Sequence, residues 1–187
     1  MPKSRRKARE AALRALYQME VGRTQLQASL SEMKANADLS PDLMNFAEEL
    51  VAGVHSHQAF LDDALASRVQ EYDFERVAAV DRNLLRIAAY ELYYCPSIPP
   101  AVTLNEAIEL AKKYSTAESG KFVNGVLAKV LLDSPKARWP EGAKRPEQEE
   151  PPEAEPLPEV ETIEADSDQL KELSRIGKWQ LRSDGED

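Results

Sequence analysis

The sequence predicts an all-α fold over residues 1–134, followed by an acidic and proline-rich tail. Apolar residues recur at helical spacing along the whole of this first part. It contains only four glycines and five prolines, fewer than strands joined by tight turns would need. No segment alternates apolar and polar residues over the length of a strand. These three observations favour a helical domain.

Six helices are expected, each from its own apolar stripe. The ranges are 4–21, 41–54, 58–69, 74–93, 104–111 and 119–131. Residues 22–39 form a linker that has room for one further short helix. Ser40-Pro41-Asp42 is a strong helix start, because it combines a capping hydroxyl, a proline at the first helical position and an acid at the positive end of the helix dipole. Thr103 is expected to cap the fifth helix.

The helix at 74–93 is apolar on most of its sides, which is typical of a central, buried helix. Four polar residues interrupt the apolar helices, and we expect them to satisfy one another in the core rather than to form a site: Arg86, Glu91, Asn105 and Asn124. Gly125 lies inside a helix, where glycine is costly, so it predicts close approach of another helix backbone.

The composition changes after residue 134. Six of the twelve prolines lie between residues 140 and 158, mixed with glutamates, so residues 135–187 are expected to be largely disordered, with a possible short helix at 168–181. Residues 1–140 carry 18 bases and 18 acids, whereas residues 141–187 carry 6 bases and 15 acids. The net charge of −9 therefore belongs to the tail and does not exclude a nucleic-acid partner. The tail either keeps the protein soluble, which we favour, or covers a basic surface of the domain.

Several classes of protein are excluded by residues that are missing. A single cysteine allows no internal disulfide, and His55 and His57 point apart on a helix, so no metal site is expected. There is no glycine-rich phosphate loop and no carboxylate pair in an apolar setting. The longest uncharged run has 14 residues and is broken by prolines, too short to cross a membrane. We expect a cytoplasmic protein that is not an enzyme, has no catalytic residues and needs no cofactor.

The N-terminus is strongly basic. Six bases lie within the first 14 residues and are opposed only by Glu10: Lys3, Arg5, Arg6, Lys7, Arg9 and Arg14. Bases at a helix N-terminus oppose the helix dipole, so local stability does not explain them. Arginine, which dominates here, forks onto phosphates and stacks on unpaired bases. The alternative is a helix start that is merely solvated, and we favour contact with a single-stranded nucleic acid over it.

Seven segments resemble, in order, the bacterial transcription antitermination factor family NusB. They are RRKARE (5–10), ALYQ (15–18), ELVAGV (49–54), DRNLLRIAAYEL (81–92), IP (98–99), NEAIELAK (105–112) and KFVNGVL (121–127). The resemblance implies a NusB-like fold of two small helical bundles packed across each other. It also implies a non-catalytic protein that pairs with the ribosomal protein NusE and binds boxA, a single-stranded RNA element of ribosomal RNA transcripts. The complex then joins NusA, NusG and RNA polymerase.

The resemblance also assigns residues to these roles. The RNA-binding residues it implies are Lys3, Arg5, Arg6, Lys7, Arg9, Glu118, Lys121 and Phe122. Phe122 would stack on a base if its ring is exposed and would be a core residue otherwise. Tyr17 and Asp81 are the residues implied to contact NusE, and the family also leaves a homodimer open.

Two other functions are weighed against this one. NusB-like domains also occur fused to ribosomal RNA cytosine methyltransferases, but residues 134–187 cannot supply a catalytic domain with its glycine loop and cysteines. A helical adaptor that binds only protein is the second alternative, and the basic N-terminus argues against it.

Overall fold

The computed structural model describes residues 2–69 and 73–139. The α-helices are α1 (Pro2–Val21), α2 (Leu26–Asn36), α3 (Pro41–Ser56), α4 (Gln58–Ala66), α5 (Ala79–Tyr94), α6 (Pro100–Tyr114) and α7 (Ala117–Asp133). A short 3-10 helix, η1 (Phe74–Arg76), precedes α5. No strand occurs in these two ranges, so the predicted all-α class is confirmed.

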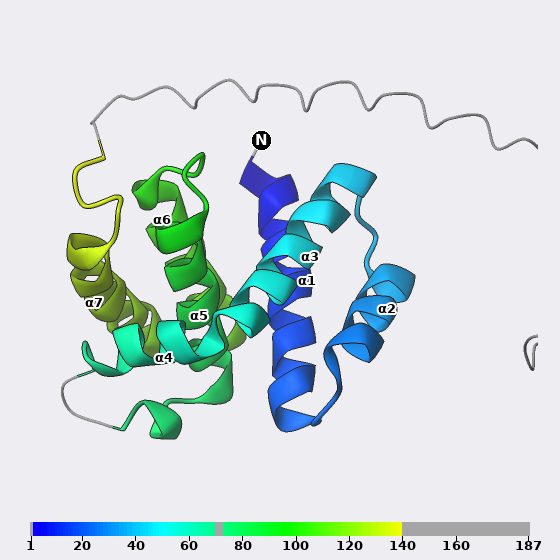
Figure 1. Cartoon of the computed structure of the whole chain (residues 1–187), viewed down its shortest axis with the longest axis horizontal. Helices are drawn as coiled ribbons and strands as arrows, with labels where there is room; N and C mark the ends of the chain where they lie inside the picture. The colour runs from blue at the N-terminus through cyan, green and yellow to red at the C-terminus, as the bar shows by residue number, and fades with distance from the viewer. Residues whose placement is uncertain (1, 70–72, 140–187) are drawn as a thin grey trace, which may run out of the picture. The chain divides into compact units, whose positions relative to one another are not determined.

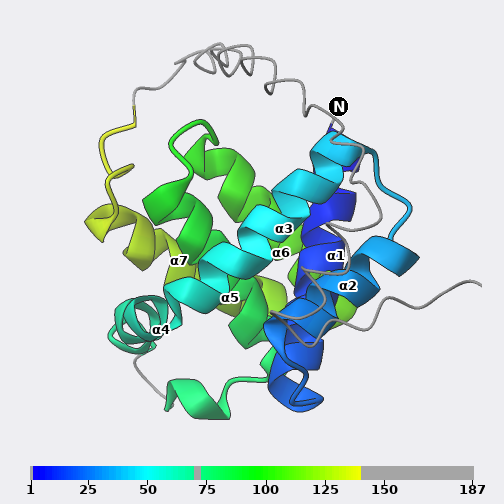
Figure 2. The ribbon, with the colours of Figure 1, turned by 45° about the vertical axis from the view of Figure 1, so that its right-hand side comes forward.

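The helices form two groups. Figure 1 shows α1, α2 and α3 on one side and α4 to α7 on the other, and the grouping persists in the rotated view of Figure 2. Helix α5 contacts α1 and α3 of the first group as well as α4, α6 and α7 of its own. Two small bundles that share α5 as their common wall match the expected architecture.

The central position of α5 follows from its composition. Every residue from 83 to 92 is buried, as expected for a helix that is apolar on most sides. The helix ends at Tyr94, just before Pro96. Proline suits the first turn of a helix, and α6 begins at Pro100 with Pro99 as its N-cap residue. The expectation that Thr103 caps this helix is therefore wrong.

Other helix boundaries in the structure differ by a few residues from those expected from the sequence. Helix α2 occupies the predicted linker and is held to α1 by Ser29, whose hydroxyl donates to the carbonyl of Ala15 at 3.0 Å. Helix α7 begins two residues earlier than expected, because Thr116 is its N-cap and accepts a hydrogen bond from the amide of Ser119 at 3.1 Å. The segment at 74–78 forms η1 and a short connection instead of the first turn of α5.

Of the four polar residues expected in the core, two are buried in hydrogen-bond networks and two are exposed. Arg86 is buried and makes a bidentate pair with Asp62 (2.7 and 2.8 Å), and its Nη1 also donates to Glu20 and to Asn83. Glu91 is fully buried in a second network, which it forms with Arg9 and Thr103. Asn105 and Asn124, by contrast, are exposed. Both asparagines lie on the solvent side of their helices, away from the apolar stripes that α6 and α7 bury.

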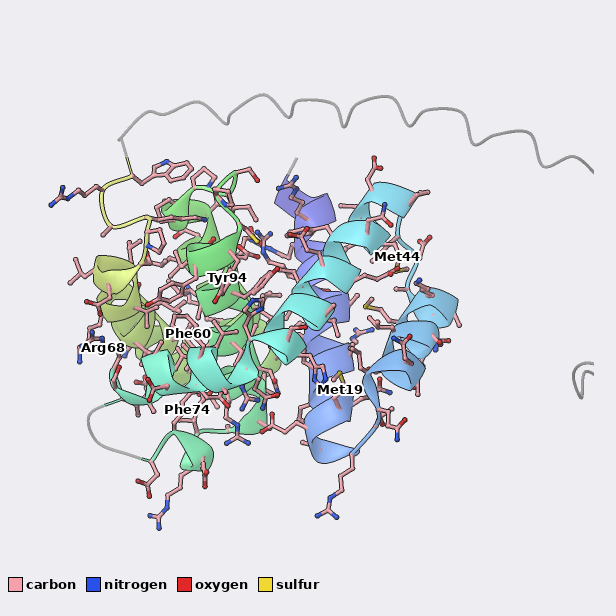
Figure 3. All side chains as sticks on the ribbon, in the orientation of Figure 1. Met19, Met44, Phe60, Arg68, Phe74 and Tyr94 are labelled. Atoms are coloured by element: carbon pink, nitrogen blue, oxygen red, sulfur yellow. The ribbon has the colours of Figure 1, made fainter. Side chains whose placement is uncertain are left out.

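The glycine prediction was also wrong in its position. Apart from its chain neighbours and the backbone of its own helix, no atom lies within 4 Å of a Cβ built on Gly125, so no other helix approaches it. The close approach occurs at Gly53 of α3, where a Cβ would overlap the ring of Tyr90. That ring stacks on Tyr94, with centroids 5.3 Å apart. Figure 3 labels Tyr94 beside Phe60, and both aromatic side chains are partly exposed.

The described fold extends beyond residue 134. Lys136 is buried, and its Nζ donates to the backbone carbonyls of Glu91 (2.7 Å) and Ile98 (2.6 Å), which anchors residues 134–139 to the end of α5. Burial lowers the pKa of this lysine. The remaining tail, with the possible helix at 168–181, lies outside the described residues. Within the described ranges, no helix has both the length and the apolar character that crossing a membrane requires.

Candidate nucleic-acid interface

The basic N-terminal segment forms the first two turns of α1. Arg5 and Arg6 are half-buried and Lys7 is exposed, while for Lys3 only the helical backbone is described. The guanidinium of Arg5 lies over the ring of Phe46 of α3, 5.1 Å from its centroid. The helix therefore presents cations close to α3 and α6, and not as an isolated arm.

Arg6 is held by an acid from a distant part of the chain. Its Nε and Nη2 donate to the two carboxylate oxygens of Glu106 on α6, at 2.8 and 2.9 Å. The Glu106 side chain is nearly buried, whereas 36% of the Arg6 side chain is exposed. These hydrogen bonds raise the pKa of the Arg6 guanidinium above its ordinary value. A charged and partly accessible guanidinium results.

Arg9 does not fit the expected RNA surface, and this expectation is corrected. It is only 3% exposed, and its Nε and Nη2 donate to the carboxylate of Glu91 at 2.6 and 3.0 Å. Glu91 also accepts from the hydroxyl of Thr103 at 2.7 Å. Because a buried charge must be paired, Arg9 is committed to the core that joins α1, α5 and α6.

A second ion pair joins α1 to α6 one turn further along. Lys113 donates to the carboxylate of Glu10 at 2.7 Å, and its Nζ lies over the ring of Tyr114 at 4.9 Å. Burial acts to raise the pKa of Glu10, but the hydrogen bonds from Lys113 and Tyr114 lower it overall. Two ion pairs thus join α1 to α6. In the first, α1 supplies the cation (Arg6 with Glu106), and in the second, α6 supplies it (Lys113 with Glu10).

The three candidates on α7 lie at its N-terminal end. Glu118 and Lys121 are both highly exposed and pair with each other at 3.1 Å. Phe122 is half-buried and packs against the core with part of its ring accessible. A Cβ on Gly120 would meet the side chain of Lys112 at 3.0 Å, so this part of α7 borders α6. Helix α6 therefore lies next to both sets of predicted RNA contacts.

Lys112 and Lys113 were missed by reasoning from the sequence. Both are exposed at the end of α6, between the two predicted sets. Lysines in the last turn of a helix complement its dipole, so nothing in the sequence separates a local role from a binding role. Only their place between α1 and α7 makes them candidates.

Tyr17 borders an apolar groove. Its side chain is 40% exposed, which agrees with the expected surface aromatic. A groove of about 480 Å³ lies beside it, between α1 and α2, and Val80 of α5 and Tyr114 of α6 also line it. Met33 of α2 and Ala37, the residue directly after α2, also line it. The groove is of a size and character suited to an apolar side chain of a partner.

Asp81 follows Val80, which lines this groove, but is itself only 6% exposed. Its Oδ2 accepts hydrogen bonds from the hydroxyls of Ser119 (2.8 Å) and Ser115 (3.3 Å), which ties the start of α5 to the start of α7. Its Oδ1 is buried without a hydrogen-bond partner among the described residues. A carboxylate oxygen in this state is stabilised by any donor that reaches it.

The structure offers neither a reactive thiol nor a cluster of metal ligands among the residues it describes. Cys95 is buried, and burial raises the pKa of its thiol to about 12, which leaves it protonated at neutral pH. Within residues 2–69 and 73–139, no group of three or more potential metal ligands is found.

Comparisons with known proteins match this domain. Residues 6–132 match the model of the NusB family. The transcription antitermination protein NusB of Geobacillus kaustophilus is 45% identical over 126 residues, which cover 67% of this chain and 94% of the relative. That of Anaeromyxobacter dehalogenans is 43% identical over 139 residues, which cover 74% and 97%. These relatives carry the name of a transcription factor and not of an enzyme.

Solved structures agree. T. maritima NusB superposes with a TM-score of 0.66 at 36% identity, covering 70% of this chain and 92% of that one. A crystal structure of the antitermination factors NusB and NusE in complex with dsRNA contains a chain with a TM-score of 0.65 and 27% identity, covering 71% and 99%. The match spans the helices that carry the candidate interface, and the chain belongs to the NusB family of transcription antitermination proteins.

Proposed function

We propose that this protein is a cytoplasmic, non-catalytic antitermination factor that binds boxA-type single-stranded RNA together with the ribosomal protein NusE. The observation that carries the RNA part is the row of accessible cations across α1, α6 and α7, on a domain whose bases and acids are equal in number when these cations are included. Such a row fits a phosphate backbone. The solved NusB relative in complex with NusE and RNA supports both partners.

The proposed RNA surface consists of residues from three helices. From the predicted set it keeps Lys3, Arg5, Arg6, Lys7, Glu118, Lys121 and Phe122, and we add Lys112 and Lys113 because both are exposed on α6. Arg9 is left out because it is buried. The half-exposed ring of Phe122 stacks on a base, and the cations hold the phosphates on either side. Entry of the complex into a larger assembly with NusA, NusG and RNA polymerase is part of the same proposal.

Arg6→Ala is expected to weaken binding of boxA RNA about tenfold and to lower the salt slope of the binding constant by about 1, because one phosphate contact is lost. The measurement is RNA affinity by fluorescence anisotropy across a salt series. Lys34→Ala on α2 is the control, since it removes the same charge from the exposed Lys34–Glu48 pair away from the proposed surface. Equal slopes for Arg6→Ala and the wild type would remove Arg6 from the interface.

NusE is proposed to bind at the groove beside Tyr17. The exposed aromatic ring and the apolar walls form an anchor site for NusE, whereas Asp81 is buried and its Oδ1 is out of reach of a partner in this structure. Asp81 holds Ser119 as well, so its substitution would disturb the fold. Tyr17 is therefore the better residue to test.

Tyr17→Ala is expected to weaken NusE binding at least tenfold without changing the melting temperature, because an exposed anchor contributes to binding and little to folding. Calorimetric titration with purified NusE measures it. Phe60→Ala removes another exposed ring, on α4, and serves as the matched control. If the two variants bind NusE equally well, the interface lies elsewhere.

A protein-only adaptor is the competing function. It predicts assembly with NusE that is insensitive to salt and to RNA, whereas the proposed factor binds NusE and RNA more tightly together than singly. Self-association of the free protein, measured by sedimentation, tests the homodimer that the family leaves open.

A further inference from the structure

The guanidinium of Arg6 donates hydrogen bonds from one of its edges only. Nε and Nη2 donate to the two oxygens of Glu106, at 2.8 and 2.9 Å. Within residues 2–69 and 73–139, Nη1 has no hydrogen-bond partner. A guanidinium carries five N–H donors in a rigid plane, so three remain for another acceptor. These three point away from Glu106, because the plane fixes their direction.

Glu106 is itself held firmly. It lies in the middle of α6 and is 5% exposed, among buried neighbours that include Thr103, Ala107 and Leu110. Its carboxylate has therefore little freedom to follow a mobile partner. A flexible arginine bound on one edge to a fixed carboxylate is restricted to a single orientation before any ligand arrives.

We propose that Glu106 is a positioning residue that aims the unused edge of Arg6 at a phosphate of the bound RNA. This inference rests on the proposed function and adds a residue that does not itself touch RNA. Glu106 sits behind Arg6 with 7% of its side chain exposed, whereas 36% of the Arg6 side chain faces solvent. The phosphate binds the outer edge, and the carboxylate holds the inner one.

The proposal makes a prediction opposite in sign to simple electrostatics. An acid near a phosphate repels it, so removal of an acid should strengthen RNA binding. Removal of a positioning acid should instead weaken RNA binding. Without that acid, the Arg6 side chain is no longer held in one orientation and loses more conformational entropy when it binds the phosphate. The change in affinity on neutralising Glu106 separates the two.

Glu106→Gln in the full chain is expected to weaken binding of single-stranded boxA RNA about fivefold. Glu109→Gln is the matched control. Glu109 lies one turn further along α6 and interacts with Arg6 only at a distance, while its carboxylate accepts from Lys112 at 3.0 Å. The control loses the same charge and should bind RNA as tightly as the wild type or more tightly.

A double-mutant cycle decides whether Glu106 acts through Arg6. In the Arg6→Ala background, Glu106→Gln should have no further effect on RNA affinity. The same fivefold loss in both backgrounds would indicate a general structural role and overturn the proposal. Arg6→Lys provides a second route if Glu106→Gln does not fold. Because lysine keeps the charge but has no second edge with which to hold Glu106 and a phosphate at once, it should bind RNA more weakly than the wild type although the net charge is unchanged.

The results also separate this inference from the proposed function. If Arg6→Ala weakens RNA binding and Glu106→Gln leaves it unchanged or strengthens it, Glu106 has no positioning role and the RNA-binding function stands. If the wild-type chain does not bind the RNA, alone or with NusE, or if Arg6→Ala binds it normally, the RNA part of the proposed function fails and the inference fails with it.

Discussion

Replacing Arg9 with methionine is expected to lower the free energy of unfolding by about 3–5 kcal/mol. The substitution leaves the carboxylate of Glu91, which is fully buried, with only the hydroxyl of Thr103 as a side-chain partner. An unpaired charge in the core is far more costly than the loss of a contact at the surface. Chemical denaturation monitored by circular dichroism measures the change.

Two further variants test this explanation. Arg9→Met combined with Glu91→Leu should recover most of the lost stability, because both charges are then gone and the volume is roughly kept. Arg5→Met, one turn earlier on α1, removes a half-buried arginine over the same Phe46 ring and should cost about 1 kcal/mol or less. If Arg9→Met were no more destabilising than Arg5→Met, the ion pair would not be part of the core.

Gly53→Ala is expected to destabilise the protein by about 1–3 kcal/mol, the usual cost of overpacking a core. The added methyl would overlap the ring of Tyr90. The ring cannot simply turn aside, since it is buried and stacked on Tyr94 and lies 5.9 Å from the ring of His57. The melting temperature should fall by several degrees, as thermal denaturation would show.

Gly125→Ala is the matched control for this prediction. It makes the same change in the interior of an α-helix, but no atom beyond its chain neighbours and its own helix backbone lies within 4 Å of the new methyl. Alanine has the higher helix propensity, so this variant should gain about 0.5–1 kcal/mol. A loss of stability at both positions would mean that close packing at Gly53 is not the cause.

These two positions show why the sequence was misleading about glycine. Both lie inside helices, and the helical context alone makes each of them costly. Which glycine meets a ring depends on how α3 crosses α5, and that crossing joins residues 37 positions apart. The close approach was predicted at Gly125 on α7, whereas it occurs at Gly53 on α3.

The helix boundaries also show which features local sequence predicts and which depend on contacts between helices. Apolar spacing predicted six of the helices because each buries one face, and that face is written in the local order of residues. Thr103 was assigned as a cap on local grounds, yet its hydroxyl donates to Glu91 on the neighbouring helix α5. Local capping rules could not anticipate an acceptor supplied by another helix.

By itself, the sequence determined the all-α class, the central place of the helix rich in apolar residues, the family and the concentration of cations at the N-terminus. Only the tertiary structure decided what those cations do. Arg9 and Arg6 are three residues apart on one helix, but they meet acids 82 and 100 residues away, one sealed in the core and the other at its edge. Pairing across such separations depends on how whole helices pack, and packing leaves no period in the local sequence from which it could be predicted.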